Sequence, residues 1–354
     1  MSVKERWTYL IINIYILEMK NRFSLVLLLC FFILSCTEKN NEIERIANLE
    51  YDLVTDSIFA RMPGSILYQD GIVYWQDATS PTDFMHAVDV KTGMELAAFG
   101  DIGQGPAEFT LPLFSLASGG IYINDSNKPL EMLYKVDHKA SVSTSSKQYV
   151  NVPDATRLLH LANSKILYLC PNEKQMFQLY QDNSATYCWG ERPIKNELAN
   201  AYDIFQGNIA YNKHKGMLIY SSIQFPYIAL FENTKDGNWE LVKDMKGDID
   251  YTVNEGRLKF SSDTGKGAME IALTEDFIVL LQSDYDTEEY VSREQAGRDL
   301  SSLPHSLFVY DYKLNLKKII NMSFPMLRLC GDLESNTVYA ISVNPEFELI
   351  KLEL

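Results

Sequence analysis

One composite phrase recurs six times along this chain and limits the folds that it can adopt. Each copy is a β-prone apolar run with an anchor residue, followed by a polar loop and a second β-prone run. The anchors stand 46 to 60 residues apart and are Tyr74, Tyr122, Tyr168, Tyr220, Val279 and Tyr339. Short runs of this composition, bounded by Gly, Asn, Asp and Pro, indicate strands. A fixed repeat of such units predicts an all-β chain built by duplication.

The number of copies predicts a six-bladed β-propeller, because propeller blades carry about four strands each. The last copy supplies only three candidate strands, over 328–330, 337–343 and 348–352. We expect the missing outer strand from the stretch NLEYDLVTDSIFA, residues 48–60, which would close the ring and leave no exposed end blade. A seven-bladed ring would need one more blade, for which 249–268 is the candidate.

The N-terminus has the features of a secretory signal. Lys20 and Arg22 precede an apolar run over 23–34, which is too short to span a bilayer as a helix. The run ends in Ile-Leu-Ser-Cys, which resembles a bacterial lipobox, so Cys36 is predicted to carry lipid. We expect the true start at Met19, and the alternative is a buried hairpin or a membrane span over 7–34.

These features predict three segments along the chain. They are a signal peptide over 1–35, the lipidated Cys36 with a flexible tether over 36–48, and one propeller domain over 49–354. Several acyl chains on one residue hold a protein stably at a membrane surface. The membrane is therefore a predicted partner, and the predicted location is the cell envelope, at the outer membrane.

The chain is strongly acidic. Its formal net charge is −15, and it becomes −17 without residues 1–35, which hold four basic and two acidic residues. Nucleic-acid affinity depends mainly on Lys and Arg that neutralise phosphates. We therefore expect no nucleic-acid partner.

Cysteine and histidine show no metal-binding pattern. After loss of the signal and lipidation of Cys36, the remaining thiols are Cys170, Cys188 and Cys330. Cys170 and Cys188 either pair, if their strands are neighbours, or serve with Cys330 as small buried apolar residues. The five histidines are scattered and are expected at the surface or in loops. We predict no catalytic residue, no metal and no cofactor.

The stretch FGDIGQGPAEFTLP, residues 99–112, is predicted to be a corner between two blades. Gly103 and Gly105 would permit positive φ, Pro106 would fix the backbone, and Glu108 would accept backbone N–H bonds. Phe109 and Leu111 would pack between blades. The alternatives are a ligand-contacting loop and a nucleotide site, although no helix follows to complete a phosphate cradle.

The pattern Gly103-x-Gly105-Pro106-x-Glu108-Phe109, the lipobox and blade phrases such as SLFVYDYKLNLKKII resemble one known family. The chain is similar, over roughly residues 45–354, to the TolB-like six-bladed β-propeller lipoproteins of Gram-negative bacteria. This resemblance implies a fold and a lipid anchor more than an activity. The fifth unit departs from the pattern, since a long acidic insertion over 284–302 separates its strands.

The insertion marks the expected place of a ligand site, because long loops on a rigid scaffold concentrate function. We expect the site where residues 284–302 meet 224–227 and 81–84. The candidate ligand-binding residues are Trp75, Tyr227, Tyr285, Tyr290, Arg293 and Arg298. The alternative for the aromatic residues is packing between blades. The acidic residues at 284–289 lack the spacing of an EF-hand and are expected to form a solvated loop.

Two kinds of function remain open, because fold alone does not determine function. The favoured hypothesis is a lipid-anchored envelope propeller that binds a protein partner, a small molecule or a glycan, or serves as a scaffold, without catalysis. The alternative is an enzyme that acts on carbohydrate or a related small molecule in the central funnel. Clustered Asp, Glu, His and Arg at one mouth would favour the enzyme, and a mouth lined with apolar and hydroxyl side chains would favour binding.

Overall fold

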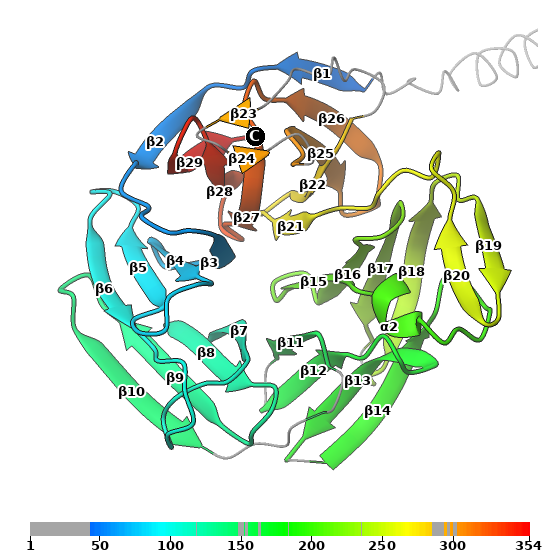
Figure 1. Ribbon diagram of the computed structural model, residues 1–354, viewed down its shortest axis with the longest axis horizontal. Coiled ribbons are helices and arrows are strands. Elements are labelled where there is room, and N and C mark those ends of the chain that lie inside the picture. The colour runs from blue at the N-terminus through cyan, green and yellow to red at the C-terminus, as the bar shows by residue number, and fades with distance from the viewer. Residues whose placement is uncertain are drawn as a thin grey trace, which may run out of the picture. The chain divides into compact units, whose positions relative to one another are not determined.

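The computed structural model describes residues 43–117, 119–147, 152, 155–161, 164–182, 184–234, 236–284, 294–295, 298–299 and 303–354. Its larger compact unit is Ile43–Leu354. This unit is a ring of six antiparallel blades around a central axis, as Figure 1 shows. The predicted all-β, six-bladed propeller is confirmed.

Each blade is numbered here by the order of its innermost strand in the chain. Blade 1 holds β3 (Pro63–Gln69), β4 (Ile72–Asp77), β5 (Met85–Asp89) and β6 (Glu95–Phe99). Blade 2 holds β7 (Pro112–Ala117), β8 (Gly120–Asp125), β9 (Glu131–Val136) and β10 (Val142–Lys147). Blade 3 holds β11 (Arg157–His160), β12 (Lys165–Leu169), β13 (Gln175–Gln181) and β14 (Ser184–Glu191).

The second half of the ring has the same plan with additional strands. Blade 4 holds β15 (Gly207–Asn212), β16 (Met217–Ser222), β17 (Tyr227–Asn233) and β18 (Trp239–Lys246). Blade 5 holds β21 (Glu270–Leu273), β22 (Phe277–Gln282), β25 (Ser306–Asp311), β26 (Leu316–Asn321) and β1 (Glu44–Ala47). Blade 6 holds β27 (Met326–Gly331), β28 (Thr337–Val343), β29 (Phe347–Glu353) and β2 (Tyr51–Thr55).

The six anchor residues occupy the same position in every blade. All six lie in the second strand of their blades, β4, β8, β12, β16, β22 and β28. Five of these side chains are buried, and Tyr122 is half-buried. Both faces of a central blade strand pack on neighbours, which explains why these runs are apolar almost throughout.

The N-terminal segment closes the ring, as the sequence predicts. Strand β2 pairs antiparallel with β29, with Tyr51 opposite Leu352. One further strand was not expected: β1 pairs parallel with β26, with Glu44 opposite Lys318. The tether predicted over 36–48 therefore overlaps a strand of the ring at its C-terminal end.

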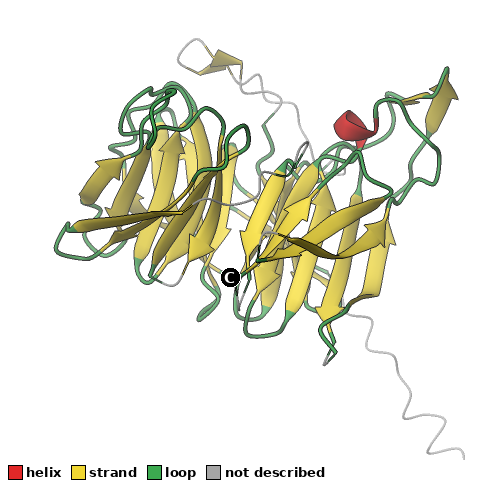
Figure 2. Cartoon of the chain, turned by 90° about the horizontal axis from the view of Figure 1, so that it is seen from below, coloured by secondary structure: helices red, strands yellow, loops and turns green. Residues whose placement is uncertain are grey.

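Within the described residues, three small elements lie outside the blades. Residues 249–268 form no seventh blade but contain a two-stranded hairpin of β19 (Tyr251–Asn254) and β20 (Arg257–Phe260). Helix α2 (Ala201–Ile204) precedes blade 4 and is drawn in red in Figure 2. Within the insertion, β23 (Glu294–Gln295) and β24 (Arg298–Asp299) form a second short hairpin.

The connection between β6 and β7 contains the predicted corner residues. Neither Gly103 nor Gly105 adopts a positive φ, so the predicted reason for these glycines is wrong. The carboxylate of Glu108 occupies the space that a Cβ would need at either glycine, and it accepts the Gly105 N–H at 2.7 Å. Phe109 is fully buried, but Leu111 is 53% exposed and does not pack between blades as expected.

Cys170, Cys188 and Cys330 form no disulfide with one another. Cys170 and Cys330 are buried, and Cys188 is half-buried. The pairing of Cys170 with Cys188, which the sequence left open, does not occur.

Candidate functional site

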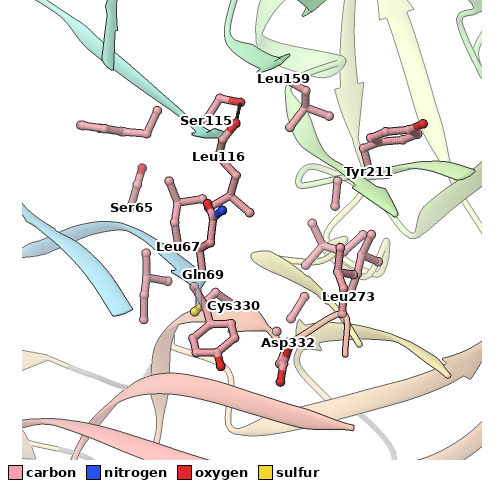
Figure 3. Close-up of a pocket in the computed structure, with 18 of the residues that line it drawn as sticks. Ser65, Leu67, Gln69, Ser115, Leu116, Leu159, Tyr211, Leu273, Cys330 and Asp332 are labelled. Atoms are coloured by element: carbon pink, nitrogen blue, oxygen red, sulfur yellow. Dashed lines mark hydrogen bonds between the residues drawn. The ribbon is translucent and has the colours of Figure 1, made fainter. Parts of the chain in front are cut away.

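A central channel runs through the ring, and a ligand could enter it. Its volume is about 1090 Å³, and the innermost strands of all six blades line it (Figure 3). The innermost strand of each blade lines the channel along its length, so the channel has one mouth where these strands begin and another where they end. We call the mouth where the innermost strands begin the entry mouth, and the other the exit mouth.

Part of the channel lining is apolar. Leu67, Leu116, Leu159 and Leu273 come from four different blades and are named here the leucine belt (Figure 3). Leu116 is 37% exposed although it belongs to an innermost strand. Tyr211 adds an aromatic ring from blade 4. This lining offers apolar contact to a ligand in the middle of the channel.

The entry mouth carries an arginine cluster, defined here as Arg157, Glu270 and Arg328. The Arg328 guanidinium lies 3.2 Å from the Glu270 carboxylate and donates to Gly64 O at 2.6 Å, so it joins blades 5, 6 and 1. Arg157 lines the channel from blade 3 and is exposed. Burial raises the pKa of Glu270, and the charges of Arg328 and Arg157 oppose this rise.

The exit mouth carries more acid than base. Asp70, Asp332 and Glu334 line it together with Lys91 and Lys213. The Asp332 carboxylate accepts the Glu334 N–H at 3.0 Å, which fixes the turn after β27. The two mouths therefore differ in charge as well as in the strand ends that form them.

A buried polar network lies in the channel wall between blades 2 and 3. The Nε2 atom of His160 lies 2.8 Å from Glu131 Oε2, and Asn124 donates to the same oxygen at 2.8 Å. The ring of Tyr122 stacks on the His160 ring, with 3.9 Å between the centroids. The backbone N–H of His160 donates to Ser115 Oγ at 2.8 Å. The expectation that every histidine lies at the surface or in a loop is wrong for His160, whose side chain is 9% exposed in β11.

Two of the candidate ligand-binding residues are core residues. Trp75 is 2% exposed, stacks on His86 at 4.2 Å and packs between blades 6 and 1. Tyr227 is 9% exposed and donates its hydroxyl to Asp244 at 3.1 Å. Neither lines the channel, because both belong to strands further from the axis and face a neighbouring blade.

The remaining candidates are not described at the side-chain level. Arg298 lies in β24, where only the backbone is described. Cys36, Tyr285, Tyr290 and Arg293 lie outside the described residues. They stay predictions.

The two loops expected to meet the insertion turn their aromatic residues inward. The loop 81–84 joins β4 to β5, and 224–227 leads from β16 into β17. Phe84 and Phe225 are almost completely buried in these loops. Like the corner residues Gly103, Gly105, Pro106, Glu108 and Phe109, these two loops contribute no residue to the described channel lining.

Two features are absent from the described residues. No three side chains of His, Cys, Asp or Glu come together there in a way that could hold a metal ion. No helix in that part of the chain has the length and apolar character to cross a membrane.

Sequence comparison agrees with the class of protein that the ring and its channel define, a six-bladed β-propeller. The family model described as TolB-like 6-blade propeller-like matches residues 45–327. The chain belongs to this family. No protein of curated function matches the sequence.

Several solved structures have a similar fold at low identity. A gluconolactonase from Xanthomonas campestris is 11% identical, with 83% of this chain and 86% of that chain covered and a TM-score of 0.43. The calcium-binding protein regucalcin from Agrobacterium tumefaciens is 8% identical, with 87% and 95% covered and a TM-score of 0.48. A luciferin-regenerating enzyme is 10% identical, with 87% and 96% covered and a TM-score of 0.46. With TM-scores below 0.5, these similarities say nothing about a ligand or a reaction of this chain.

Proposed function

We propose that this protein is a lipid-anchored envelope propeller that holds a small ligand, or a small part of a partner, in its central channel without converting it. The observation that carries the proposal is the leucine belt between two charged mouths. Ligand pockets typically enclose about 300–1,000 Å³ and are mostly apolar with a few polar groups that fix orientation. The channel, at about 1090 Å³, is large enough for such a molecule.

The contacts that Glu270 and Arg328 already make at the entry mouth support binding over catalysis. The carboxylate of Glu270 is held by Arg328, which also donates to the carbonyl oxygen of Gly64. A general acid or base must be free to reach a proton on the substrate. At the entry mouth these groups instead hold three blades together.

The proposed anchor rests on the N-terminal sequence. A basic segment, an apolar run and Cys36 follow one another in the order that export and lipidation require. Strand β1 begins at Glu44, so the linking segment spans at most on the order of 25–30 Å when extended. A lipid on Cys36 would therefore keep the ring close to the membrane, for which we propose the outer membrane.

The anchor is tested by the intact mass of the protein purified from membranes. We expect a chain that begins at Cys36 and carries acyl chains, and the Cys36→Ser variant should lose them. An unmodified chain that begins upstream of Cys36 would contradict the anchor.

The channel is tested with N-phenyl-1-naphthylamine, a neutral apolar dye that fluoresces when it leaves water. We expect binding to the wild type and its loss in Leu116→Trp, because the larger ring fills the leucine belt. Leu241→Trp is the matched control, since Leu241 is 52% exposed on the outer strand β18. Equal binding by the wild type and both variants would place the dye elsewhere and contradict the proposal.

An enzyme that acts on carbohydrate in the channel is the alternative, and one observation favours it. His160 lines the channel wall and is paired with Glu131, the arrangement by which a carboxylate orients a histidine base. Incubation with a glycan library, followed by mass spectrometry, should then reveal products that the His160→Asn variant does not form. Absence of any product leaves binding as the function.

A further inference from the structure

We propose that the channel selects an amphiphilic monoanion, with its anionic group at Arg157 and its apolar body against the leucine belt. The ligand class is a carboxylate or sulfonate attached to an apolar group. This inference rests on the proposed function, because it names the chemistry of the molecule that the channel would hold.

The arginine cluster has an excess of positive charge. It contains two guanidinium groups and one carboxylate, and the carboxylate already accepts a hydrogen bond from Arg328. Arg328 already donates to Gly64 O and Leu327 O as well as to Glu270, and it is not among the residues that line the described channel. The second guanidinium, Arg157, is therefore the group that a ligand would meet.

The Arg157 guanidinium can contact a ligand in the channel, whereas Arg328 does not line it. Its side chain is exposed in the channel lining and donates one hydrogen bond, to Thr156 O at 2.9 Å. Within the part of the chain that the structure describes, no carboxylate lies at ion-pair distance from it. Guanidinium groups bind carboxylate and phosphate oxygens through paired N–H donors, which makes Arg157 a fitting anion contact.

The apolar contact lies next to this charge. Arg157 and Leu159 are two residues apart in β11, so their side chains leave the same face of the strand. Two residues of a strand span about 7 Å. A ligand with its anion at Arg157 would therefore reach the leucine belt with the first carbons of its apolar body.

The exit mouth supports one orientation of the ligand. Asp70, Asp332 and Glu334 outnumber Lys91 and Lys213 there, so an anion is less favourable at that end. The excess negative charge on the walls of the exit mouth repels an anionic group. The anionic end of the ligand is thereby directed to the entry mouth.

Two fluorescent probes with the same aromatic body test the inference. They are 8-anilinonaphthalene-1-sulfonate, which carries one anionic group, and the neutral N-phenyl-1-naphthylamine. The protein as expressed is reconstituted in lipid nanodiscs, and only the signal that is lost in Leu116→Trp is counted as channel binding. This subtraction removes the dye that partitions into lipid.

We expect the wild type to bind the sulfonate more tightly than the neutral dye. The Arg157→Gln variant should lose about tenfold in affinity for the sulfonate, which corresponds to one charge-assisted hydrogen bond. Its affinity for the neutral dye should stay unchanged. The control is Arg61→Gln, because Arg61 is an exposed arginine in the connection before β3, and its loss changes net charge equally.

The outcomes separate this inference from the proposed function. If the neutral dye binds in the channel but the sulfonate is not preferred, or Arg157→Gln has no effect, the anion selectivity is wrong and channel binding stands. If Arg61→Gln weakens sulfonate binding as much as Arg157→Gln does, the loss of affinity comes from the change in net charge, and the proposed anion contact at Arg157 is wrong. If neither dye gives a channel signal, both proposals fail.

Discussion

His160 and Glu131 lie 2.8 Å apart, from Nε2 to Oε2, across the interface between blades 2 and 3. Glu131 is 1% exposed and also accepts a hydrogen bond from Asn124. Among the described residues, this interface has the smallest apolar cluster, with five buried members against ten or more at every other interface. A polar contact therefore joins the two blades where apolar contact is smallest.

Removal of the carboxylate at position 131 should weaken this interface. In Glu131→Ala, the amide of Asn124 and the ring of His160 lose a buried acceptor, which costs about 2–4 kcal/mol. Thermal unfolding followed by circular dichroism should show the loss, and hydrogen exchange should rise first in β7 and β11. Glu131→Gln is the milder control, because its amide oxygen still accepts one bond. Equal stability of wild type and Glu131→Ala would contradict the structural role.

A side chain at Gly103 should destabilise the corner between β6 and β7. A Cβ there meets the Glu108 carboxylate, which is held in place by the Gly105 N–H. We expect Gly103→Ala to destabilise the protein by about 1–2 kcal/mol through overpacking. In a Glu108→Ala background the same substitution should cost clearly less. An identical cost in both backgrounds would show that backbone conformation, and not the carboxylate, requires glycine.

Strand β1 should contribute to stability mainly through Arg45. Its Nη1 atom lies 2.7 Å from Asp284 Oδ2, and the Asp284 side chain is only 3% exposed. The solvated loop expected over 284–289 is therefore wrong for Asp284, while 285–289 lie outside the described residues. We expect Arg45→Ala to lower the free energy of unfolding by about 1–3 kcal/mol, because a buried carboxylate loses its cationic partner.

The control for this experiment lies one residue earlier on the same strand. Glu44 is exposed and lies 4.0 Å from Lys318, so Glu44→Ala should change stability by at most about 0.5 kcal/mol. Equal thermal shifts for the two variants would mean that the buried pair adds nothing beyond strand pairing.

Acid stability should depend on Asp311 in the turn between β25 and β26. Burial alone raises the pKa of Asp311, but hydrogen bonds from the Asn315 and Lys313 backbone, from the Asn315 side chain and from Lys317 together lower the pKa to about 2. The ionised carboxylate therefore stabilises the fold above its unfolded pKa near 4, and this contribution is lost as the pH falls from about 4 to 2.

We expect the contribution of Asp311 to be about 2 kcal/mol, since one pKa unit corresponds to about 1.4 kcal/mol. Melting temperatures measured between pH 5 and pH 2 should fall more steeply for the wild type than for Asp311→Asn. Parallel curves for the two proteins would show that Asp311 is not a source of the acid sensitivity.

The repeat of the sequence determined the fold because its signals are local. The apolar second strand of each blade recurs with its anchor, from Tyr74 to Tyr339, and each run is short and bounded by turn residues. The closing strand β2 was also predictable, since the last copy lacked an outer strand and residues 48–60 alternate. Strand β1 was not, because a four-residue run with a single half-buried residue, Ile46, next to a polar segment shows no alternation that marks a strand.

The composition of the channel was decided by tertiary structure alone. Arg157, Glu270 and Arg328 are far apart in the sequence, and each stands in the first half of an innermost strand of a different blade. Every blade packs on two neighbours, so apolar side chains occur on both faces of its strands, and alternation does not tell which side chain meets the axis. Trp75 and Tyr227 illustrate this: both have the composition of a ligand contact, yet ring closure buries them between blades. The sequence by itself predicted the lipid anchor and determined the repeating sheet, because both depend on local signals. Closure of the ring decided which residues line the channel.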